Sequence, residues 1–441
     1  MIDGNTVVFL THSITHVLAN SVEAIIVFMP MVLLIELPLS LLVFSGMLRW
    51  HYRYYRRGPL RIQPTVSCLI TCYSEGEDVR QTIVTLCEQT YRGHIEIIPI
   101  IDGATQNADT YNAAIKCRAF MKRYPGRTLR VLPKWQRGGR VSSLNAGLSK
   151  AHGEIVLALD GDTSFDNDMI SKIVHEFQDP NVPAVAGSLR VRNLNSSLAT
   201  CMQGLEYMIS LQGAKVGLAE WNMINNISGA FGAFRRKFLL QIGGWNTHSA
   251  EDLDLTIRIK QYMGRHKNLR IPFAAHGMGH TDAPDTFKQL LQQRLRWDGD
   301  LLFLFMRKHK YAFSKQLMGR RNTLFTLVYG LMQSIMLPFL MIIYNIWVLV
   351  TYPTAVFVAV LLVQYTYYLV MATLHFLFFW LLVSERFRDD ARMLIWLPVF
   401  PLYSLGMRLF SAFAILNEWI RRSHEESNMA PWWVLKKGKR F

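Results

Sequence analysis

Two aspartates separated by one glycine are the residues of this chain best suited to chemistry. Asp160 and Asp162 follow Ile155–Leu159, an unbroken apolar run with the length of a buried strand. In open α/β sheets, ligands bind just beyond the carboxyl ends of the strands, and two close carboxylates repel unless a cation lies between them. Mg²⁺ or Mn²⁺ takes such oxygen ligands and bridges phosphates, so the pair predicts a metal–diphosphate site. Alone, the pair also fits a solvated turn.

A third acid is expected at the same edge of the sheet. Asp102 ends a second apolar run, Ile95–Asp102, and the loop Thr71–Glu77 follows the first run of the same block. Because parallel strands end at one edge of a sheet, these segments should meet Asp160 in one crevice. There Asp102 and Glu75 would accept hydrogen bonds from a nucleotide base or ribose. Taken alone, Asp102 fits an ordinary turn before a glycine.

Two short motifs place charged groups where helices should begin. In R-G-G-R, Arg137–Arg140, the glycines allow close approach of a ligand, and a helix N-terminus attracts phosphate. Arg140 could pair with diphosphate oxygens in bidentate fashion, although a surface turn is the plain alternative. In A-E-D-L-D-L, Ala250–Leu255, Asp252 would serve either as a helix cap or as the general base for an attacking hydroxyl.

A third motif, Q-R-L-R-W, lies inside an amphipathic segment. Gln293, Arg296 and Trp297 are spaced i, i+3 and i+4, so they share roughly one face of a helix. An amide, a guanidinium and an indole on one face can contact a diphosphate and stack on a sugar ring. The alternative is an interfacial tryptophan beside a snorkelling arginine.

The segments that carry these motifs alternate as in a doubly wound α/β domain. Apolar runs of strand length alternate with amphipathic segments of helix length, which predicts a mostly parallel sheet. We expect strands at 66–72, 95–102, 129–133, 155–159 and 184–188, and helices at 77–89, 107–123, 140–151, from 198, and 285–310. The last of these helices is amphipathic and is expected to lie on a membrane surface.

Long apolar segments flank this block on both sides. A run at 24–48 is long enough to cross a bilayer, and its basic flank, Arg49–Arg61, should lie in the cytoplasm. Further apolar segments follow at 324–350, 355–383 and 394–416. The chain is therefore expected to divide into a first membrane region at 1–61, a cytoplasmic domain at 62–311 and a second membrane region at 312–441.

The last apolar segment differs from the others. It contains Pro398, Pro401 and Arg408, which suit a broken or cavity-lining helix. A full crossing here would put the basic C-terminal tail outside, against the positive-inside rule. The sequence therefore leaves open whether 394–416 spans the bilayer or re-enters it.

The composition also indicates which partners the protein binds and which state its cysteines adopt. The chain has 441 residues, is 51% hydrophobic and carries a formal charge of +16, with basic residues concentrated beside the apolar blocks. That placement favours anionic lipid headgroups, and no motif for RNA or DNA is present, so no nucleic acid partner is expected. The five cysteines form no metal or disulfide spacing and should be reduced, mostly buried thiols.

In this order, the acids and the Q-R-L-R-W motif resemble the D, DxD, TED and QxxRW signature of processive family 2 membrane glycosyltransferases. This class contains the cellulose, hyaluronan, chitin and poly-N-acetylglucosamine synthases. The resemblance covers Val66–Lys310 with motifs. It implies a GT-A domain inserted between transmembrane helices in the cell inner (plasma) membrane, with Mg²⁺ or Mn²⁺ as cofactor. The implied reaction is inverting transfer from a UDP-sugar to a growing polysaccharide, which is passed across the lipid bilayer.

The resemblance also assigns roles to individual residues. Those implied to bind the nucleotide sugar are Thr71, Tyr73, Glu75, Asp102, Arg140, Asp160, Gln293 and Arg296. Those implied to hold the metal are Asp162 and Asp160, and those implied in catalysis are Asp252, as the base, and Glu251. Those implied to contact the acceptor are Ser228, Gly229 and Trp297.

Two residues depart from the signature, and several readings stay open. Ala250 stands where the motif usually has threonine, and Arg140 stands where many members have lysine. Within the class the chain is most similar to the bacterial poly-β-1,6-N-acetylglucosamine synthases, which implies UDP-GlcNAc as donor and export subunits as possible partners. The alternatives are a synthase of another β-glycan, a non-processive transferase acting on a lipid phosphate, or an inactive transporter or scaffold.

Overall fold

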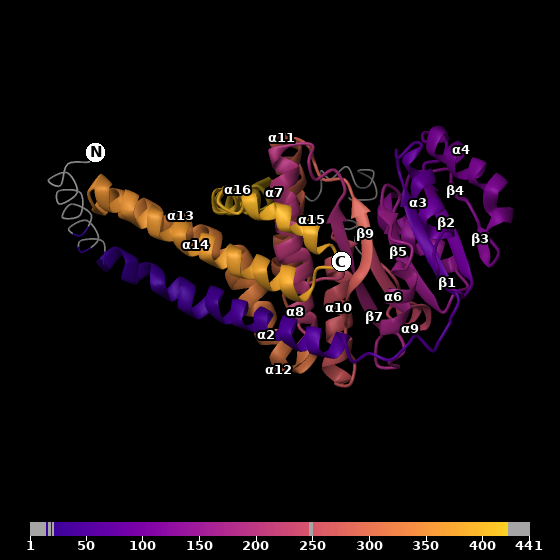
Figure 1. Ribbon diagram of the computed structural model, residues 1–441, viewed down its shortest axis with the longest axis horizontal. Coiled ribbons are helices and arrows are strands. Elements are labelled where there is room, and N and C mark those ends of the chain that lie inside the picture. The colour runs from indigo at the N-terminus through magenta and orange to yellow at the C-terminus, as the bar shows by residue number, and fades with distance from the viewer. Residues whose placement is uncertain (1–14, 16–18, 20–21, 247–249, 422–441) are drawn as a thin grey trace.

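A sheet-containing part and a bundle of long helices make up the two ends of the molecule. The computed structural model describes residues 22–246 and 250–421, together with Thr15 and Ala19. Figure 1 shows the long helices α2 (Leu37–Tyr54), α13 (Leu337–Thr351) and α14 (Thr354–Leu382) extending away from the sheet.

A single mixed sheet forms the frame of the site. Within the described residues its nine strands are β1 (Val66–Cys72), β2 (Ile95–Asp102), β3 (Arg127–Leu129), β4 (Leu132–Lys134), β5 (Ile155–Asp160), β6 (Ser164–Phe165), β7 (Ala184–Val191), β8 (Phe231–Arg235) and β9 (Phe273–Thr281). The order is β3-β2-β1-β5-β8-β7-β9-β6, and β4 also pairs with β2. Most pairs are parallel, whereas β8 runs antiparallel between β5 and β7. The predicted α/β class is confirmed.

The central strands are buried on both faces, as expected for a parallel sheet covered by helices. All seven residues of β1 and all eight of β2 are buried, which accounts for their mostly apolar sequences. The covering helices include α3 (Asp78–Cys87), α4 (Ala108–Lys116), α5 (Gly139–Lys150), α6 (Met169–Glu176), α9 (Arg236–Gln241) and α10 (Glu251–Arg265).

The structure differs from the sequence prediction at some elements. The strand predicted at 129–133 is two short strands, β3 and β4, which pair with successive parts of β2. The helix predicted at 107–123 ends as a 3₁₀ segment, Cys117–Arg123. The strands β8 and β9 were not predicted, because their glycine- and alanine-rich sequences have weak strand propensity and owe their conformation to the neighbouring strands.

Three helical segments are long and apolar enough to cross a membrane. They are Val22–Tyr54, Lys315–Thr351 and Thr354–Leu382, close to three of the predicted spans. In the fourth region, a helical pair, Phe387–Trp396 and Phe400–Arg421, bends by 74° at its break. A broken helix was one of the alternatives that the sequence left open, and Pro398 lies within the observed break.

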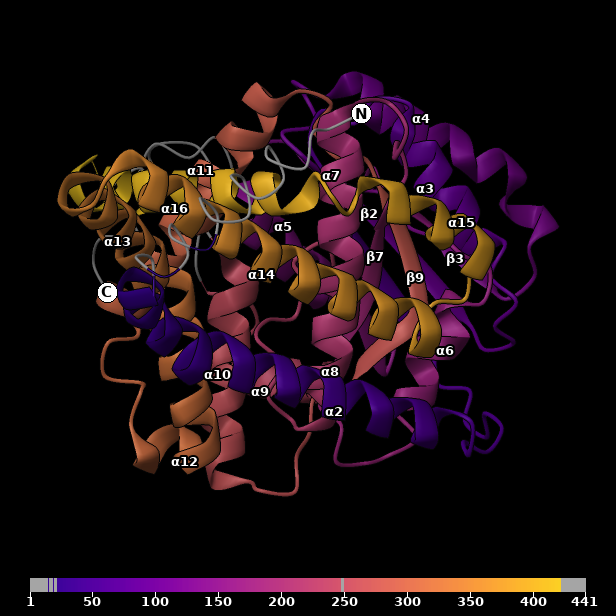
Figure 2. The same cartoon turned by 60° about the vertical axis from the view of Figure 1, so that its left-hand side comes forward.

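The helix bundle packs directly on the sheet domain. The continuous helical stretch α7 (Leu198–Glu206), η3 (Tyr207–Ala214) and α8 (Lys215–Glu220) lies between them. Gly46 of α2 faces Gly217 of α8 so closely that a β-carbon on Gly46 would lie 2.1 Å from the Gly217 carbonyl oxygen. Such small-residue contacts let helix backbones approach one another. Figure 2 shows α2 and α8 adjacent from a second direction.

The predicted amphipathic helix at 285–310 is present as α11 (Phe287–Phe303) followed by the π-helical turn η4 (Leu304–Lys308). It packs against α16 (Phe400–Arg421), the second half of the bent pair. The Q-R-L-R-W motif therefore lies on a helix held between the sheet domain and the candidate membrane helices (Figure 1).

Candidate active site

One cavity of about 740 Å³ opens at the carboxyl ends of β1, β2 and β5. All the residues given candidate roles from the sequence line it: Thr71, Tyr73, Glu75, Asp102, Arg140, Asp160, Asp162, Ser228, Gly229, Glu251, Asp252, Gln293, Arg296 and Trp297. They come from segments that lie more than 200 residues apart in the chain. The cavity also reaches Tyr329, Gly330 and Ser334 of η5 (Thr326–Met336), which belongs to a candidate membrane span.

The two aspartates and the loop after β1 form the carboxylate-rich part of the cavity. Asp160 is the last residue of β5, and Asp162 follows one glycine later. A β-carbon on Gly161 would lie 3.1 Å from both the Glu75 side chain and the Thr71 carbonyl oxygen, so a larger residue would crowd this contact. Burial and the charges of Asp162 and Asp160 raise the pKa of Glu75 to about 7. Partial burial and the charge of Asp160 also raise the pKa of Asp162.

This part of the cavity fits a hard divalent cation. Its donors are carboxylate oxygens, and Oε2 of Glu75 is buried with no hydrogen-bond partner among the residues that the structure describes. The described residues contain no group of three or more histidine, cysteine, aspartate or glutamate side chains arranged to hold a metal. Two carboxylates are enough for Mg²⁺, which commonly completes its shell with water and substrate phosphate.

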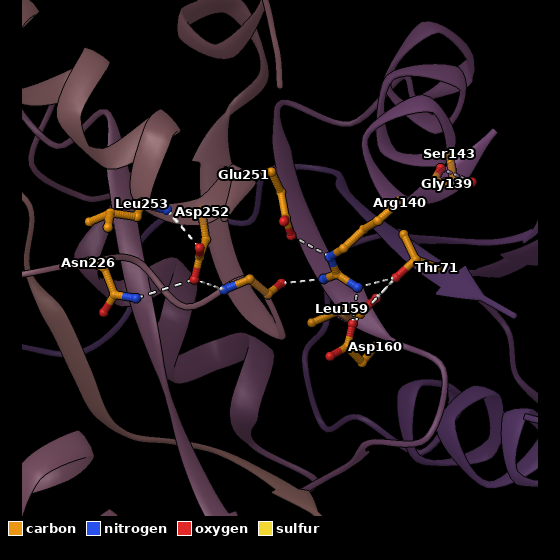
Figure 3. A network of polar contacts seen from close by, with 11 residues as sticks. Thr71, Gly139, Arg140, Ser143, Leu159, Asp160, Asn226, Glu251, Asp252 and Leu253 are labelled. Atoms are coloured by element: carbon orange, nitrogen blue, oxygen red, sulfur yellow. Dashed lines mark hydrogen bonds and ion pairs between the residues drawn. The ribbon is translucent and has the colours of Figure 1, made fainter. Parts of the chain in front are cut away.

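Arg140 is the centre of the polar network beneath the cavity (Figure 3). From the first turn of α5, its guanidinium contacts the carboxylate of Asp160 and donates to Glu251 Oε1 at 2.5 Å. It also donates to Thr71 Oγ1 and to the Gly229 carbonyl oxygen, each at 2.7 Å. Arg140 was predicted to pair with a diphosphate, but the structure shows its guanidinium bonded to four groups of the protein.

Asp102 organises the glycine turn before α5. Its two carboxylate oxygens accept hydrogen bonds from the backbone N–H groups of Gly138, at 2.9 Å, and Gly139, at 2.8 Å. Lys134 Nζ donates to the same carboxylate at 2.6 Å. Asp102 is therefore buried and turned toward the protein, and it fixes the R-G-G-R turn that presents Arg140.

Asp252 lies at the second position of α10 and faces the cavity. Its Oδ2 accepts hydrogen bonds from the Gly229 N–H, at 3.0 Å, and from Asn226 Nδ2, at 3.3 Å (Figure 3). Its Oδ1 accepts from the N–H of Leu253 at 2.7 Å. These hydrogen bonds hold the carboxylate toward the cavity. The sequence offered a helix cap and a general base as alternative roles for Asp252. In the structure Asp252 lies in the first turn of a helix and also lines the cavity.

The neighbouring acid, Glu251, is turned the other way. It is only 5% exposed, and its carboxylate pairs with Arg140. Burial raises the pKa of Glu251, and Arg140 opposes that rise. Ala250, at the position where the motif usually has threonine, has a left-handed backbone with φ of 47° and lies just before α10.

The three motif residues of α11 reach the opposite wall of the cavity. Trp297 is 40% exposed there, and Oε1 of Gln293 is buried without a hydrogen-bond partner. Among the described residues, Arg296 makes no hydrogen bond or ion pair, which leaves its guanidinium available to an anion in the cavity.

Several cavity residues were not identified from the sequence. Lys215 and Lys260 line it, yet they are only 2% and 4% exposed, and neither has an ion-pair partner among the described residues. Burial lowers the pKa of Lys215 to about 8 and that of Lys260 to about 7. The one available signal was a lysine inside the apolar helical segment L-Q-G-A-K-V-G-L. Cys72 also lines the cavity, but burial raises the pKa of its thiol, as expected for an inert cysteine.

Lys260 gives a testable pH dependence of stability. Its pKa is lowered in the folded state, so between about pH 7 and 10 the unfolded chain binds more protons and the free energy of unfolding rises with pH. The Lys260→Met variant lacks this contribution, and its stability should exceed that of the wild type most at pH 7 and below. Denaturant unfolding of both proteins from pH 6 to 9 measures the difference. A difference independent of pH would show that Lys260 titrates normally.

A family model described as "Glycosyltransferase like family 2" matches residues 64–299, just over half of the chain. The chain belongs to this family, and it is a glycosyltransferase. The match contains the whole sheet and ends within α11, so it includes every candidate site residue named above.

The chain is also similar in sequence to curated synthases from two staphylococci. The chain is 28% identical over 233 residues to the poly-β-1,6-N-acetyl-D-glucosamine synthase of Staphylococcus aureus, a match that covers 53% of each protein. It is 29% identical over 234 residues to the synthase of the same name from Staphylococcus epidermidis, again over 53% of each. The matches thus span about half the length of these relatives.

A solved structure shares the fold. The mannosyltransferase PcManGT from Pyrobaculum calidifontis, determined with GDP-mannose and Mn²⁺, superposes with a TM-score of 0.50 at 16% sequence identity. The superposition covers 88% of this chain and 98% of PcManGT. The GT-A fold expected from the sequence is confirmed.

Proposed function

We propose that this glycosyltransferase is a membrane-embedded synthase that adds sugars from a UDP-sugar donor, by inverting and processive transfer, to a growing polysaccharide. The main support is the single cavity, in which every candidate residue from the sheet, α10 and α11 meets η5 of a candidate membrane span. A donor bound at the sheet edge would thus lie next to a path into the membrane.

The proposed mechanism starts at Asp252. Its carboxylate, held by Gly229 and Asn226, takes the proton from the acceptor hydroxyl as that oxygen attacks the anomeric carbon. The bond to the diphosphate breaks on the opposite face of the sugar, and UDP leaves. The unpaired guanidinium of Arg296 then stabilises the charge on the departing diphosphate, and the Trp297 indole stacks on the acceptor sugar.

We propose that Asp160 and Asp162 hold Mg²⁺ or Mn²⁺, which would supply charge neutralisation to the diphosphate. Burial and the charge of Asp160 raise the pKa of Asp162, and a cation held by the two carboxylates would offset both effects. Chelation by EDTA should abolish turnover, and added Mg²⁺ or Mn²⁺ should restore it. Asp162→Asn should lower the affinity for Mn²⁺, measured by calorimetry or paramagnetic relaxation in the presence of UDP. Full activity in EDTA would contradict a metal-dependent site.

The proposed function also implies an arrangement of the chain in the membrane. We propose a multi-pass protein of the inner (plasma) membrane, with a cytoplasmic domain at 62–311 between membrane regions at 1–61 and 312–441. The apolar segments support it, as does the basic flank of the first segment, where Arg49 and Arg53 lie beside Glu220 of α8. The growing polysaccharide would leave along η5, with small membrane or export subunits as possible partners.

The donor proposed first is UDP-GlcNAc, because the curated relatives are named for the polymer of that sugar. The test uses purified membranes with UDP-GlcNAc, UDP-Glc and UDP-GlcA in turn, and measures UDP release together with the size of the labelled product on a gel. A long polymer from UDP-GlcNAc is the expected result. A polymer from UDP-Glc or UDP-GlcA alone would indicate another β-glycan.

A second function would use the same site differently. A non-processive transferase would add one sugar to a lipid phosphate, and the gel would then show a single addition per acceptor. The Q-R-L-R-W helix on the cavity wall and the cavity's extension to η5 favour the processive reading. Failure to release UDP from any donor with Mg²⁺ or Mn²⁺ would contradict both.

A further inference from the structure

The second residue of the Q-R-L-R-W motif, Arg294, is held by a contact that the reaction scheme above does not use. Its guanidinium pairs with Glu206 Oε2 at 2.5 Å and also lies 5.0 Å from the centre of the Trp297 ring. Arg294 is 15% exposed, and close pairing with Glu206 raises its pKa although burial acts in the opposite direction. Arg294 thus fixes one face of the indole that is proposed to stack on the acceptor.

Glu206 joins three helices that are distant in the sequence. It is the last residue of α7, at the point where the helix widens into the π-helical η3. Tyr403 of α16 donates its hydroxyl to the same oxygen, Oε2, at 2.8 Å. The carboxylate therefore links α7 under the cavity, α11 on its wall and α16 from the membrane region.

A second polar contact fixes α11 to α16 one turn further on. Ser411 of α16 donates to Asp298 Oδ2 at 2.7 Å, and Asp298 lies directly after Trp297. A further contact joins α16 to the first candidate membrane helix, where Arg408 donates to Glu36 Oε1 at 2.6 Å. Charged groups in an apolar bundle are costly unless they pair, so this ion pair anchors α16 firmly.

We propose that Glu206 is a positioning residue for the acceptor end of the active site, with Tyr403 as its anchor on the membrane side. Glu206 orients Arg294, and Arg294 in turn holds the Trp297 indole against the path of the polymer. Helix α16, the second half of the bent pair, thereby sets the distance between the catalytic cavity and the candidate membrane helices. This inference rests on the proposed acceptor role of Trp297 and extends it to residues outside the signature.

The test compares Tyr403→Phe and Glu206→Gln with the wild type. Tyr403→Phe removes only one hydroxyl, and it should raise the KM for a short oligosaccharide acceptor by about 2- to 10-fold, the factor expected for one lost hydrogen bond. The KM for the donor should stay unchanged, and the polymer should become shorter. Glu206→Gln should act in the same direction and more strongly, because it leaves Arg294 without its anion.

A matched control separates positioning from simple loss of packing. Tyr344→Phe removes a buried hydroxyl that donates to the Ala24 carbonyl oxygen at 2.8 Å, between α13 and the first candidate membrane span, and it should leave both KM values unchanged. Because Tyr403 acts through its hydrogen bond to Glu206, the acceptor KM of the double variant should be no higher than that of Glu206→Gln.

Three outcomes would overturn the positioning role. They are wild-type acceptor KM and polymer length in Tyr403→Phe, equal changes in donor and acceptor KM, or the same effects in Tyr344→Phe. A wild type that transfers only one sugar would refute the processive function, but the acceptor KM values would still test the role of Glu206.

Discussion

Replacing Asp252 with asparagine is expected to lower sugar transfer by about 10²- to 10⁴-fold, the range typical for a lost general base. The asparagine keeps the size of the side chain and can still accept a hydrogen bond from Gly229, so the local structure should persist. It cannot take the acceptor proton. Turnover is measured as UDP release, and binding of UDP by calorimetry should match that of the wild type.

Asp282→Asn is the matched control for this prediction. Asp282 also lines the cavity, but it is half-exposed and its carboxylate pairs with Arg192 at 2.6 Å, away from Asp252. This variant should keep turnover within about twofold, since exposed ion pairs contribute little. If Asp252→Asn polymerised at the wild-type rate, the base would have to be another residue.

The second large effect is expected on stability. Arg140→Met removes the cation that pairs with Glu251 and Asp160, and Glu251 then stays buried without a partner. Removal of one partner from a buried ion pair costs about 3–5 kcal/mol. The loss should widen as pH rises above the ordinary range for a glutamate carboxyl, because burial already raises the pKa of Glu251 in the folded state and the pKa rises further without Arg140.

Denaturant unfolding of the purified protein at pH 5 and pH 8 tests this prediction. Arg130→Met is the control, because Arg130 is exposed and lies 3.7 Å from Glu96, so its loss should cost less than about 1 kcal/mol. The stability of Arg140→Lys should lie between those of Arg140→Met and Arg130→Met, since an ammonium cannot reach both carboxylates. Equal stability of Arg140→Met and the wild type would mean that the buried carboxylates are protonated and need no partner.

Many strands and helices of the sheet domain could be predicted, because the sequence patterns that indicate them are local. Most residues of β1, β2 and β5 are apolar, as expected for strands buried on both faces, and acids lie at or just after their ends. Three of the candidate membrane spans could also be predicted, since their length and apolar content are local features of the sequence. Strands β8 and β9 carried no such signal, because pairing with neighbours determines their conformation.

The sequence by itself determined which residue types are available and, through the ends of two strands, that Asp102 and Asp160 reach one edge of the sheet, whereas Asp252 was assigned to the same site only by the resemblance to the family signature. Only the tertiary structure decided which way each side chain turns. Asp102 and Arg140 are turned into the protein, where they bond to the glycine turn and to Glu251, whereas Asp252 faces the cavity. The link from Glu206 to Tyr403 also depends on the packing of α7 against α16. Such contacts join residues up to 200 positions apart, and no local pattern encodes them.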